Sequence, residues 1–234
     1  MNESQKKVIA YVKGRPGYPE TAMEYIKSIV KPDSIFAEVG AGTGKFSELI
    51  ARQNFKLYAI EPDDEMRKML DVVLCCFKNV EIIKATAEQT GLQDSSIDVV
   101  TVAQALHWFD GNKFKEECLR ILKPNGVVIV LNNSPGTAEK SMIDDKFHPG
   151  HPKMRLEAIN GFFKNPVIKH FENPIEYDKE KWLSYMLSHS DSPTKTDGNY
   201  EEFLKSTAVF FDRYSNRGIL KRKTITTVYH EKMK

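Results

Sequence analysis

The segment from Phe36 to Gly44 constrains the fold more than any other part of the chain. It reads FAEVGAGTG: a short apolar run leads into three glycines at alternating positions, and a helix-like segment, residues 45–52, follows. Glycine has no Cβ and readily takes positive φ, so such a turn lets the backbone approach a ligand closely. Free N–H groups at the start of the next helix would face the same ligand. The segment therefore predicts a strand–turn–helix unit that binds a nucleotide-like cofactor.

Two other nucleotide-binding motifs do not fit this turn. A phosphate-binding P-loop would need glycine at the place of Val39 and Ser or Thr at the place of Phe46. The dinucleotide fingerprint fits the first two glycines, but Lys45 stands where a small residue lets helix and strand pack closely. The carboxylate of Glu38, beside the turn, would repel a pyrophosphate and attract an ammonium group. A cofactor with an amine, a ribose and no phosphate therefore fits best.

Four further motifs follow the turn in the order of a known family. They are Tyr58-Ala-Ile-Glu-Pro62, Ala85-Thr-Ala-Glu88, Ala103-Gln-Ala-Leu-His-Trp-Phe109 and Leu119-Arg-Ile-Leu-Lys-Pro-Asn-Gly126. With them the chain resembles the class I S-adenosylmethionine-dependent methyltransferases over about residues 15–132, in particular the small-molecule branch (type 11, trans-aconitate methyltransferase-like). The resemblance implies an enzyme that binds S-adenosyl-L-methionine and promotes direct in-line methyl transfer to a small-molecule acceptor.

Other functions stay open as alternatives. An RNA- or protein-directed methyltransferase is disfavoured because Gln104-Ala-Leu-His107 stands where many amino-group methyltransferases have an Asn/Asp-Pro-Pro-aromatic motif. A non-catalytic S-adenosylmethionine-binding protein is a second alternative, and a nicotinamide oxidoreductase is weakened by Lys45. The sequence names neither the acceptor nor the element, oxygen, nitrogen or carbon, that would be methylated.

The charge balance and the cysteine content limit the kinds of partner that the sequence predicts. Lys plus Arg (34) nearly balance Asp plus Glu (32), which gives no electrostatic case for a nucleic-acid or membrane partner. The three cysteines lack metal-ligand spacing, so no metal is expected and reduced thiols in a cytoplasmic protein are favoured. No apolar N-terminal segment suggests export, and no run approaches membrane-spanning length. The oligomeric state cannot be read from the sequence.

Apolar, β-rich runs alternate with helical patterns between Ser34 and Asn133. The pattern predicts strands at residues 34–38, 56–61, 80–85, 97–103 and 127–132, and helices at 45–52, 63–77 and 112–122, with Asp63 as an N-cap. Such alternation indicates an α/β fold with a parallel, doubly wound sheet that binds ligands at the carboxyl ends of its strands. The resemblance implies a Rossmann-like sheet of seven strands, mostly parallel with the last antiparallel, under a helical cover.

The chain changes character after Asn133. We expect residues 1–133 to form the cofactor-binding core, and residues 134–234 to supply cover or lid helices and the final strands of the same domain. Ser134–Pro152 is polar and interrupted by Pro and Gly, which is typical of a long connection or lid. Helices are expected at 152–163, 177–188 and 200–214, a strand at 167–171, a polar loop at 191–199 and a terminal strand at 219–229.

Acidic residues at strand ends are the first binding candidates. Glu61 ends the second strand 17 residues beyond Gly44, where a carboxylate can accept both ribose hydroxyls. By resemblance, Glu38 contacts the cofactor ammonium through water or backbone, and Glu88 lies at the adenine edge, although Gln89–Leu92 departs from the family pattern. The candidate cofactor-binding residues are Arg15, Tyr18, Glu38, Gly40, Ala41, Gly42, Gly44, Glu61, Pro62, Ala87, Glu88 and Gln104.

His107 is the candidate catalytic residue. A histidine titrates near neutrality and could take a proton from a nucleophilic acceptor. It could instead pack as part of a shelf for the cofactor, in which Gln104 presents its backbone to the methionine end. By resemblance, Tyr18 hydrogen-bonds to the cofactor carboxylate and Arg15 neutralises it, and either could face solvent when no cofactor is bound.

Overall fold

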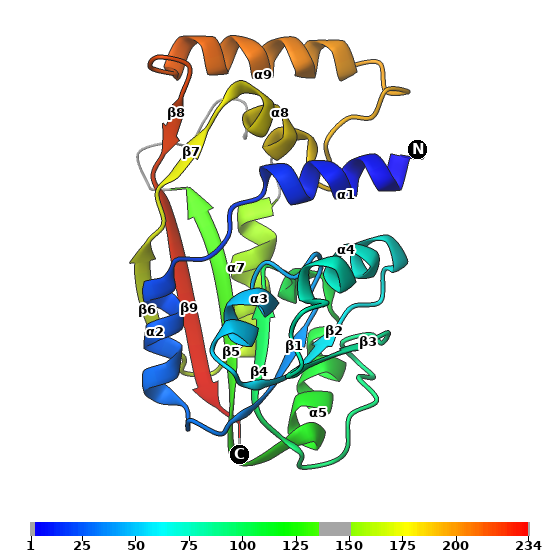
Figure 1. Cartoon of the computed structure of the whole chain (residues 1–234), viewed down its shortest axis with the longest axis vertical. Helices are drawn as coiled ribbons and strands as arrows, with labels where there is room; N and C mark the ends of the chain where they lie inside the picture. The colour runs from blue at the N-terminus through cyan, green and yellow to red at the C-terminus, as the bar shows by residue number, and fades with distance from the viewer. Residues whose placement is uncertain (1–2, 136–150, 234) are drawn as a thin grey trace. The chain divides into compact units, whose positions relative to one another are not determined.

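The chain divides into two compact units. The computed structural model describes residues 3–135 and 151–233, so most of the predicted lid Ser134–Pro152 lies outside the described residues (Figure 1). The larger unit comprises Gly17–Asn133, Lys153–Phe171 and Thr226–Lys234, and the smaller unit Met1–Pro16, Ser134–Pro152 and Glu172–Ile225. Each unit has a hydrophobic core of its own.

A seven-stranded sheet forms the centre of the larger unit. Its strand order is β3-β2-β1-β4-β5-β9-β6. The strands are β1 (Ile35–Val39), β2 (Lys56–Ile60), β3 (Val80–Ile83), β4 (Ile97–Ala103), β5 (Leu122–Pro135), β6 (Val167–Glu172) and β9 (Thr224–Lys232). The first five pair in parallel, whereas β9, the last strand of the chain, runs opposite to β5 (Figure 1). The predicted α/β sheet with an antiparallel last strand is confirmed.

The pairing of β1 sets up the ligand side of the sheet. β1 pairs with β2 on one side and with β4 on the other, so the strand order reverses direction at β1. Open parallel sheets bind ligands at such a point, beyond the carboxyl ends of the strands. Val39, the last residue of β1, lies opposite Ile60, the last residue of β2. The glycine turn and Glu61 therefore leave the sheet side by side.

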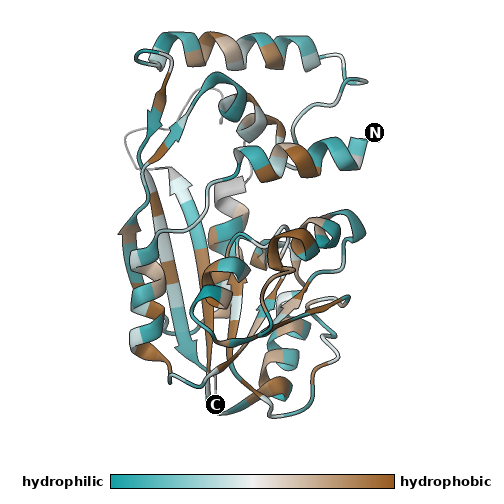
Figure 2. Cartoon of the chain, viewed as in Figure 1, coloured by the Kyte–Doolittle hydropathy of each residue, from teal (hydrophilic) through white to brown (hydrophobic). Residues whose placement is uncertain are grey.

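Helices cover both faces of this sheet. Buried side chains of α2 (Glu20–Ile29), α3 (Ser47–Arg52) and α4 (Asp64–Leu74) form one core cluster with the strands. Side chains of α5 (Gly111–Ile121) and α7 (His151–Phe162) form the second cluster. Figure 2 shows hydrophobic residues concentrated along the central strands between these layers. Strands buried on both faces are apolar throughout, which explains why the sequence pattern revealed them.

The smaller unit is mainly helical. It contains α1 (Glu3–Gly14), α8 (Lys179–Leu187), α9 (Tyr200–Tyr214) and a two-stranded antiparallel sheet of β7 (Ile175–Tyr177) and β8 (Leu220–Arg222). Trp182, fully buried, donates its Nε1–H to the Thr207 carbonyl at 3.1 Å. Gly14 lets α1 approach α8, because a Cβ there would lie 2.1 Å from the Tyr185 nitrogen.

Two local predictions for this part of the chain are wrong. The terminal strand expected at 219–229 is two strands, β8 and β9, with a break at Lys223. The strand β7 was not expected, and the following helix begins at Lys179 instead of Tyr177. None of the helices in the described ranges, 3–135 and 151–233, is long and apolar enough to cross a membrane.

Candidate functional site

The three glycines build a left-handed turn at the end of β1. Their φ angles are 72° for Gly40, 57° for Gly42 and 88° for Gly44, a region that side chains with a Cβ rarely adopt. Two consecutive N–H groups, those of Gly40 and Ala41, donate to the Ile60 carbonyl at 2.9 and 3.0 Å. The turn is thereby anchored to the end of β2.

The outer glycines of the turn differ from the middle one in what a side chain would meet. A Cβ at Gly40 would lie 2.7 Å from the Cβ of Ala105, and one at Gly44 would lie 2.9 Å from Cδ1 of Leu70. The outer glycines are therefore needed for packing against the segment after β4 and against α4. A Cβ at Gly42 would have no heavy atom within 4 Å. The middle of the turn faces open space, which is where a ligand could approach the backbone.

Glu61 supports the turn directly. It is 7% exposed, and its Oε2 accepts from the Gly42 N–H at 2.8 Å while its Oε1 accepts from the Asp63 N–H at 2.9 Å. Burial raises the pKa of the Glu61 carboxyl, and these two backbone hydrogen bonds oppose that rise. Because each carboxylate oxygen has a second acceptor site, the group can still accept two ligand hydroxyls.

Glu38 lies beneath the turn as a second buried carboxyl. It is 1% exposed and accepts a hydrogen bond from the Ser47 hydroxyl. Burial raises the pKa of Glu38 to about 8; the Ser47 hydrogen bond opposes this rise, and the Glu61 carboxyl adds to it. At neutral pH the side chain holds its proton, and a nearby cation would favour the charged form. Ser47, at the start of α3, was not among the predicted site residues.

Gln104 leaves β4 in a left-handed conformation, with φ of 61°. Its N–H donates to the Leu131 carbonyl at 2.9 Å and its Nε2 donates to the Asn133 carbonyl at 3.0 Å. Its Oε1 is buried without a hydrogen-bond partner among the described residues. Buried Asn133, which the sequence did not single out, donates from Nδ2 to the Gly17 carbonyl and accepts from the Thr226 hydroxyl.

His107 lies on a short 3₁₀ helix, η1 (Leu106–Trp108), beside the turn. Its ring is half-buried, and its centre lies 4.9 Å from the Trp108 ring, which is 61% exposed. Phe109 holds the segment after β4 in place, because its ring packs edge-on against Phe114. The same ring lies close to Gly40, where a Cβ would be only 3.2 Å from it. The structure thus brings the segment 104–109 to the glycine turn. Its roles as general base or cofactor shelf both stay predictions.

The residues predicted for the adenine edge lie after β3. Ala87 is buried, and half-buried Glu88 accepts at Oε1 from the Asp110 N–H at 3.0 Å. Pro62 is exposed between Glu61 and the cap of α4. Nothing in these contacts assigns adenine, so this role stays a prediction.

The two N-terminal candidates belong to different units. Tyr18, in the larger unit, packs edge-on against Phe46 with ring centres 5.1 Å apart. Arg15, in the smaller unit, donates from Nη2 to the Ser188 carbonyl at 3.3 Å. Its guanidinium also lies over the rings of Tyr11 and Tyr185. Their predicted contacts with a cofactor carboxylate stay predictions.

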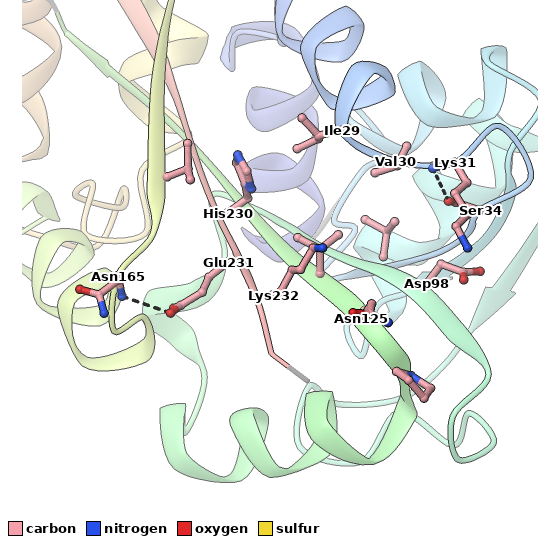
Figure 3. A pocket seen from close by; sticks show the side chains of 15 residues that line it. Ile29, Val30, Lys31, Ser34, Asp98, Asn125, Asn165, His230, Glu231 and Lys232 are labelled. Atoms are coloured by element: carbon pink, nitrogen blue, oxygen red, sulfur yellow. Dashed lines mark hydrogen bonds between the residues drawn. The ribbon is translucent and has the colours of Figure 1, made fainter.

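A hollow of the larger unit lies at the amino ends of the strands, away from the glycine turn. It has a volume of about 500 Å³ and is lined by residues that include Ser34, Asp98, Val127 and His230 (Figure 3). Asp98 already accepts from the Ile35 N–H and the Lys123 ammonium, at 2.9 and 2.7 Å. None of the predicted site residues lines this hollow. Within the described ranges, no group of three or more His, Cys, Asp or Glu side chains could hold a metal ion.

Comparison with known proteins gives a consistent result. Residues 37–130 match a family model described as a methyltransferase domain. An uncharacterized methyltransferase from Mycobacterium tuberculosis is 35% identical over 117 residues, which are 50% of this chain and 46% of that protein. The chain thus matches about half the length of this relative.

Solved structures share the fold at low sequence identity. A putative type II methyltransferase from Anaeromyxobacter dehalogenans superposes with a TM-score of 0.66 at 19% identity, covering 94% of this chain and 98% of that one. A geranyl diphosphate C-methyltransferase from Streptomyces coelicolor superposes with a TM-score of 0.52 at 13% identity, covering 92% and 76% of the two chains.

Proposed function

Since the chain belongs to the class I methyltransferases of the type 11 branch, we propose that it uses S-adenosyl-L-methionine to methylate a small-molecule acceptor. One observation carries the proposal: the middle of the glycine turn faces open space, and the N–H of Gly42 donates to the carboxylate of Glu61, which in turn interacts with the buried carboxyl of Glu38. A cofactor with a ribose and an amine, and with no phosphate, matches that combination.

The residues of the turn fit this cofactor. The open side of Gly42 leaves room for its backbone approach, and Glu61 has acceptor sites left for two ribose hydroxyls. We expect the charge of a bound ammonium to draw off the proton of Glu38, and the unpartnered Oε1 of Gln104 offers a further acceptor. When bound, S-adenosylmethionine supplies an electrophilic methyl group on a sulfonium.

The protein's own part in such a reaction is alignment and exclusion of water. Holding two reactants in line can supply about 7–11 kcal/mol of the barrier. His107 would add a factor of about 10²–10⁴ only if the acceptor must lose a proton to react. Its place on η1, at the carboxyl end of β4 beside the turn, suits that role. A carboxylate acceptor would need no base.

Charge and fold support a small acceptor over RNA or protein. Acidic and basic residues nearly balance, 32 against 34, so the chain lacks the excess charge of many nucleic-acid-binding proteins. The geranyl diphosphate C-methyltransferase, which shares the fold, is in complex with a small-molecule acceptor and S-adenosyl-L-homocysteine. An RNA- or protein-directed methyltransferase and a non-catalytic binding protein remain the alternatives.

Calorimetric titration with S-adenosylhomocysteine tests the cofactor site. We expect wild-type protein to bind one equivalent and Gly42→Val to abolish binding, because the new side chain fills the open space. Gly218→Val is the matched control: that glycine also has positive φ (76°) and open surroundings, but it lies in the smaller unit. Undiminished binding by Gly42→Val would place the cofactor elsewhere, and equal loss in both variants would make backbone strain the cause.

Methyl transfer to separate classes of acceptor tests the proposal that the acceptor is a small molecule. Formation of S-adenosylhomocysteine is measured with small-metabolite, RNA and protein fractions of a cell extract. We expect turnover with the metabolite fraction alone. Turnover with RNA or protein alone would favour the first alternative. Binding of the cofactor without consumption across all fractions would favour a non-catalytic protein.

A further inference from the structure

Two cysteines stand side by side at the end of α4. Cys75 and Cys76 directly follow the last helical residue, Leu74, and both are exposed. Their Sγ atoms lie 3.6 Å apart, within hydrogen-bonding distance for sulfur. The third cysteine, Cys118, is fully buried in α5. The chain therefore presents one accessible pair of thiols. Its buried third thiol, Cys118, can serve as a control in experiments on the pair.

The distance between the two sulfurs favours a centre that binds both of them with a bent S–centre–S angle. With metal–sulfur bonds of about 2.3 Å, a centre bonded to both sulfurs at 3.6 Å would have an S–centre–S angle of about 100°. A linear two-coordinate ion would need the sulfurs about 4.6 Å apart at the same bond length. The pair thus suits a pyramidal or tetrahedral centre better than a linear one.

Two other fates of the pair fit less well. Adjacent Cα atoms are about 3.8 Å apart, whereas disulfides normally join Cα atoms about 4.4–6.8 Å apart, so a direct disulfide would be strained. A structural zinc ion would need four protein ligands. No cluster of three or more possible ligands exists among residues 3–135 and 151–233. With the disulfide and the zinc ion set aside, the pair fits a centre that needs only two protein sulfurs. Such a centre carries a third substituent of its own.

We propose that Cys75 and Cys76 form a dithiol site for a trivalent thiophilic metalloid, with arsenic(III) as the type. With an organic arsenoxide, two As–S bonds form and the As–O bond is lost. The oxygen leaves as water with the two thiol protons. Arsenic stays trivalent, so no oxidant or reductant is required. Soft sulfur ligands favour soft centres of this kind.

Phenylarsine oxide is the probe for this site. We expect wild-type protein to take up one equivalent, seen by intact mass, with the loss of two thiols that react with maleimide. Cys75→Ser and Cys76→Ser should each bind about 10²-fold or more weakly, because a second attachment raises avidity by about that factor. Cys118→Ala, the matched control, should bind like wild type, since its thiol is buried.

Competition with small thiols separates a bridge from single attachment. A dithiol such as dimercaptopropanol should release the adduct of wild-type protein, while an equal concentration of mercaptoethanol should not. Binding by either single variant within about threefold of wild type would overturn the proposal. An adduct that depends on Cys118 would also overturn it. The measurement needs no S-adenosylmethionine, so its outcome is independent of the proposed activity.

Discussion

Glu38 shows how one residue can link the site to stability. Its carboxyl is buried under the glycine turn, and its pKa is raised from 4.5 to about 8, mainly by that burial. Below pH 4.5 both the folded and the unfolded chain hold the proton. Between pH 4.5 and about 8 the unfolded chain releases it while the folded chain keeps it, so the unfolded state is favoured increasingly. The raised pKa of Glu61 acts in the same direction.

We therefore expect the free energy of unfolding to fall as pH rises from about 5 to 8, with Glu38 contributing at most about 1.4 kcal/mol per pH unit. Glu38→Gln cannot release a proton and can still accept from the Ser47 hydroxyl, so its stability should fall less steeply. Urea unfolding of both proteins at a series of pH values measures the slopes. Equal slopes would show that Glu38 titrates normally in the folded protein.

At the scale of one element, α4 joins the site to the core. Asp63 caps this helix, because its Oδ1 accepts from the N–H groups of Glu65 and Met66 at 2.9 and 2.8 Å. The Asp63 N–H donates in turn to Glu61, and Leu70 on the same helix packs where a Cβ of Gly44 would lie. The N-terminus of α4 therefore lies next to Glu61, the residue predicted to bind the ribose.

We expect Asp63→Ala to lower the free energy of unfolding by about 1 kcal/mol, the usual cost of losing an N-cap. Asp63→Asn keeps an oxygen acceptor at the same place and should lose less than half as much. Both variants keep the backbone N–H that Glu61 accepts from, which isolates the effect of the cap. Denaturant unfolding gives the comparison, and an equal loss in the two variants would contradict the capping argument.

The same elements show what sequence can and cannot predict about the fold. The inner strands β1, β2, β4 and β5 were predicted because most of their residues are buried and apolar. The edge strand β3 is only partly buried, and its apolar run alone predicted it. The cap at Asp63 was predicted from local chemistry and is confirmed. The strand β7 was not predicted, since it exists only by pairing with β8, which is far away in the sequence. Local periodicity contains no information on such a partner.

Some residues of the candidate site could likewise be predicted from the sequence, and others could not. The motif placed Gly42 and Glu61 near one another, and the structure joins them by a hydrogen bond. Ser47 could have been noticed as a hydroxyl close after the last glycine, but only the fold shows that it reaches Glu38. Asn133 could not have been found, because its contacts with Gly17 and Thr226 come from distant parts of the chain.

At the scale of the whole molecule, the two units have separate cores and one tryptophan each. Trp182 is buried in the smaller unit, where its ring packs against Tyr177, Tyr185 and Phe210. Trp108 is exposed in the larger unit, which also holds the glycine turn. Domains with their own cores can unfold in separate steps. A ligand of the turn should then stabilise the larger unit directly.

We expect S-adenosylhomocysteine at about 100 times its Kd to add about 2.7 kcal/mol to the unfolding of the larger unit alone. Hydrogen exchange in β1, β2 and β4 should slow by about 100-fold, the same free energy expressed as a rate. In a Trp108→Phe variant, fluorescence then reports only on Trp182, and its thermal transition should stay unchanged when ligand is added. A shift of the Trp182 transition equal to that of the strands would show either that the units unfold as one or that a residue of the smaller unit, such as the candidate Arg15, also binds the ligand.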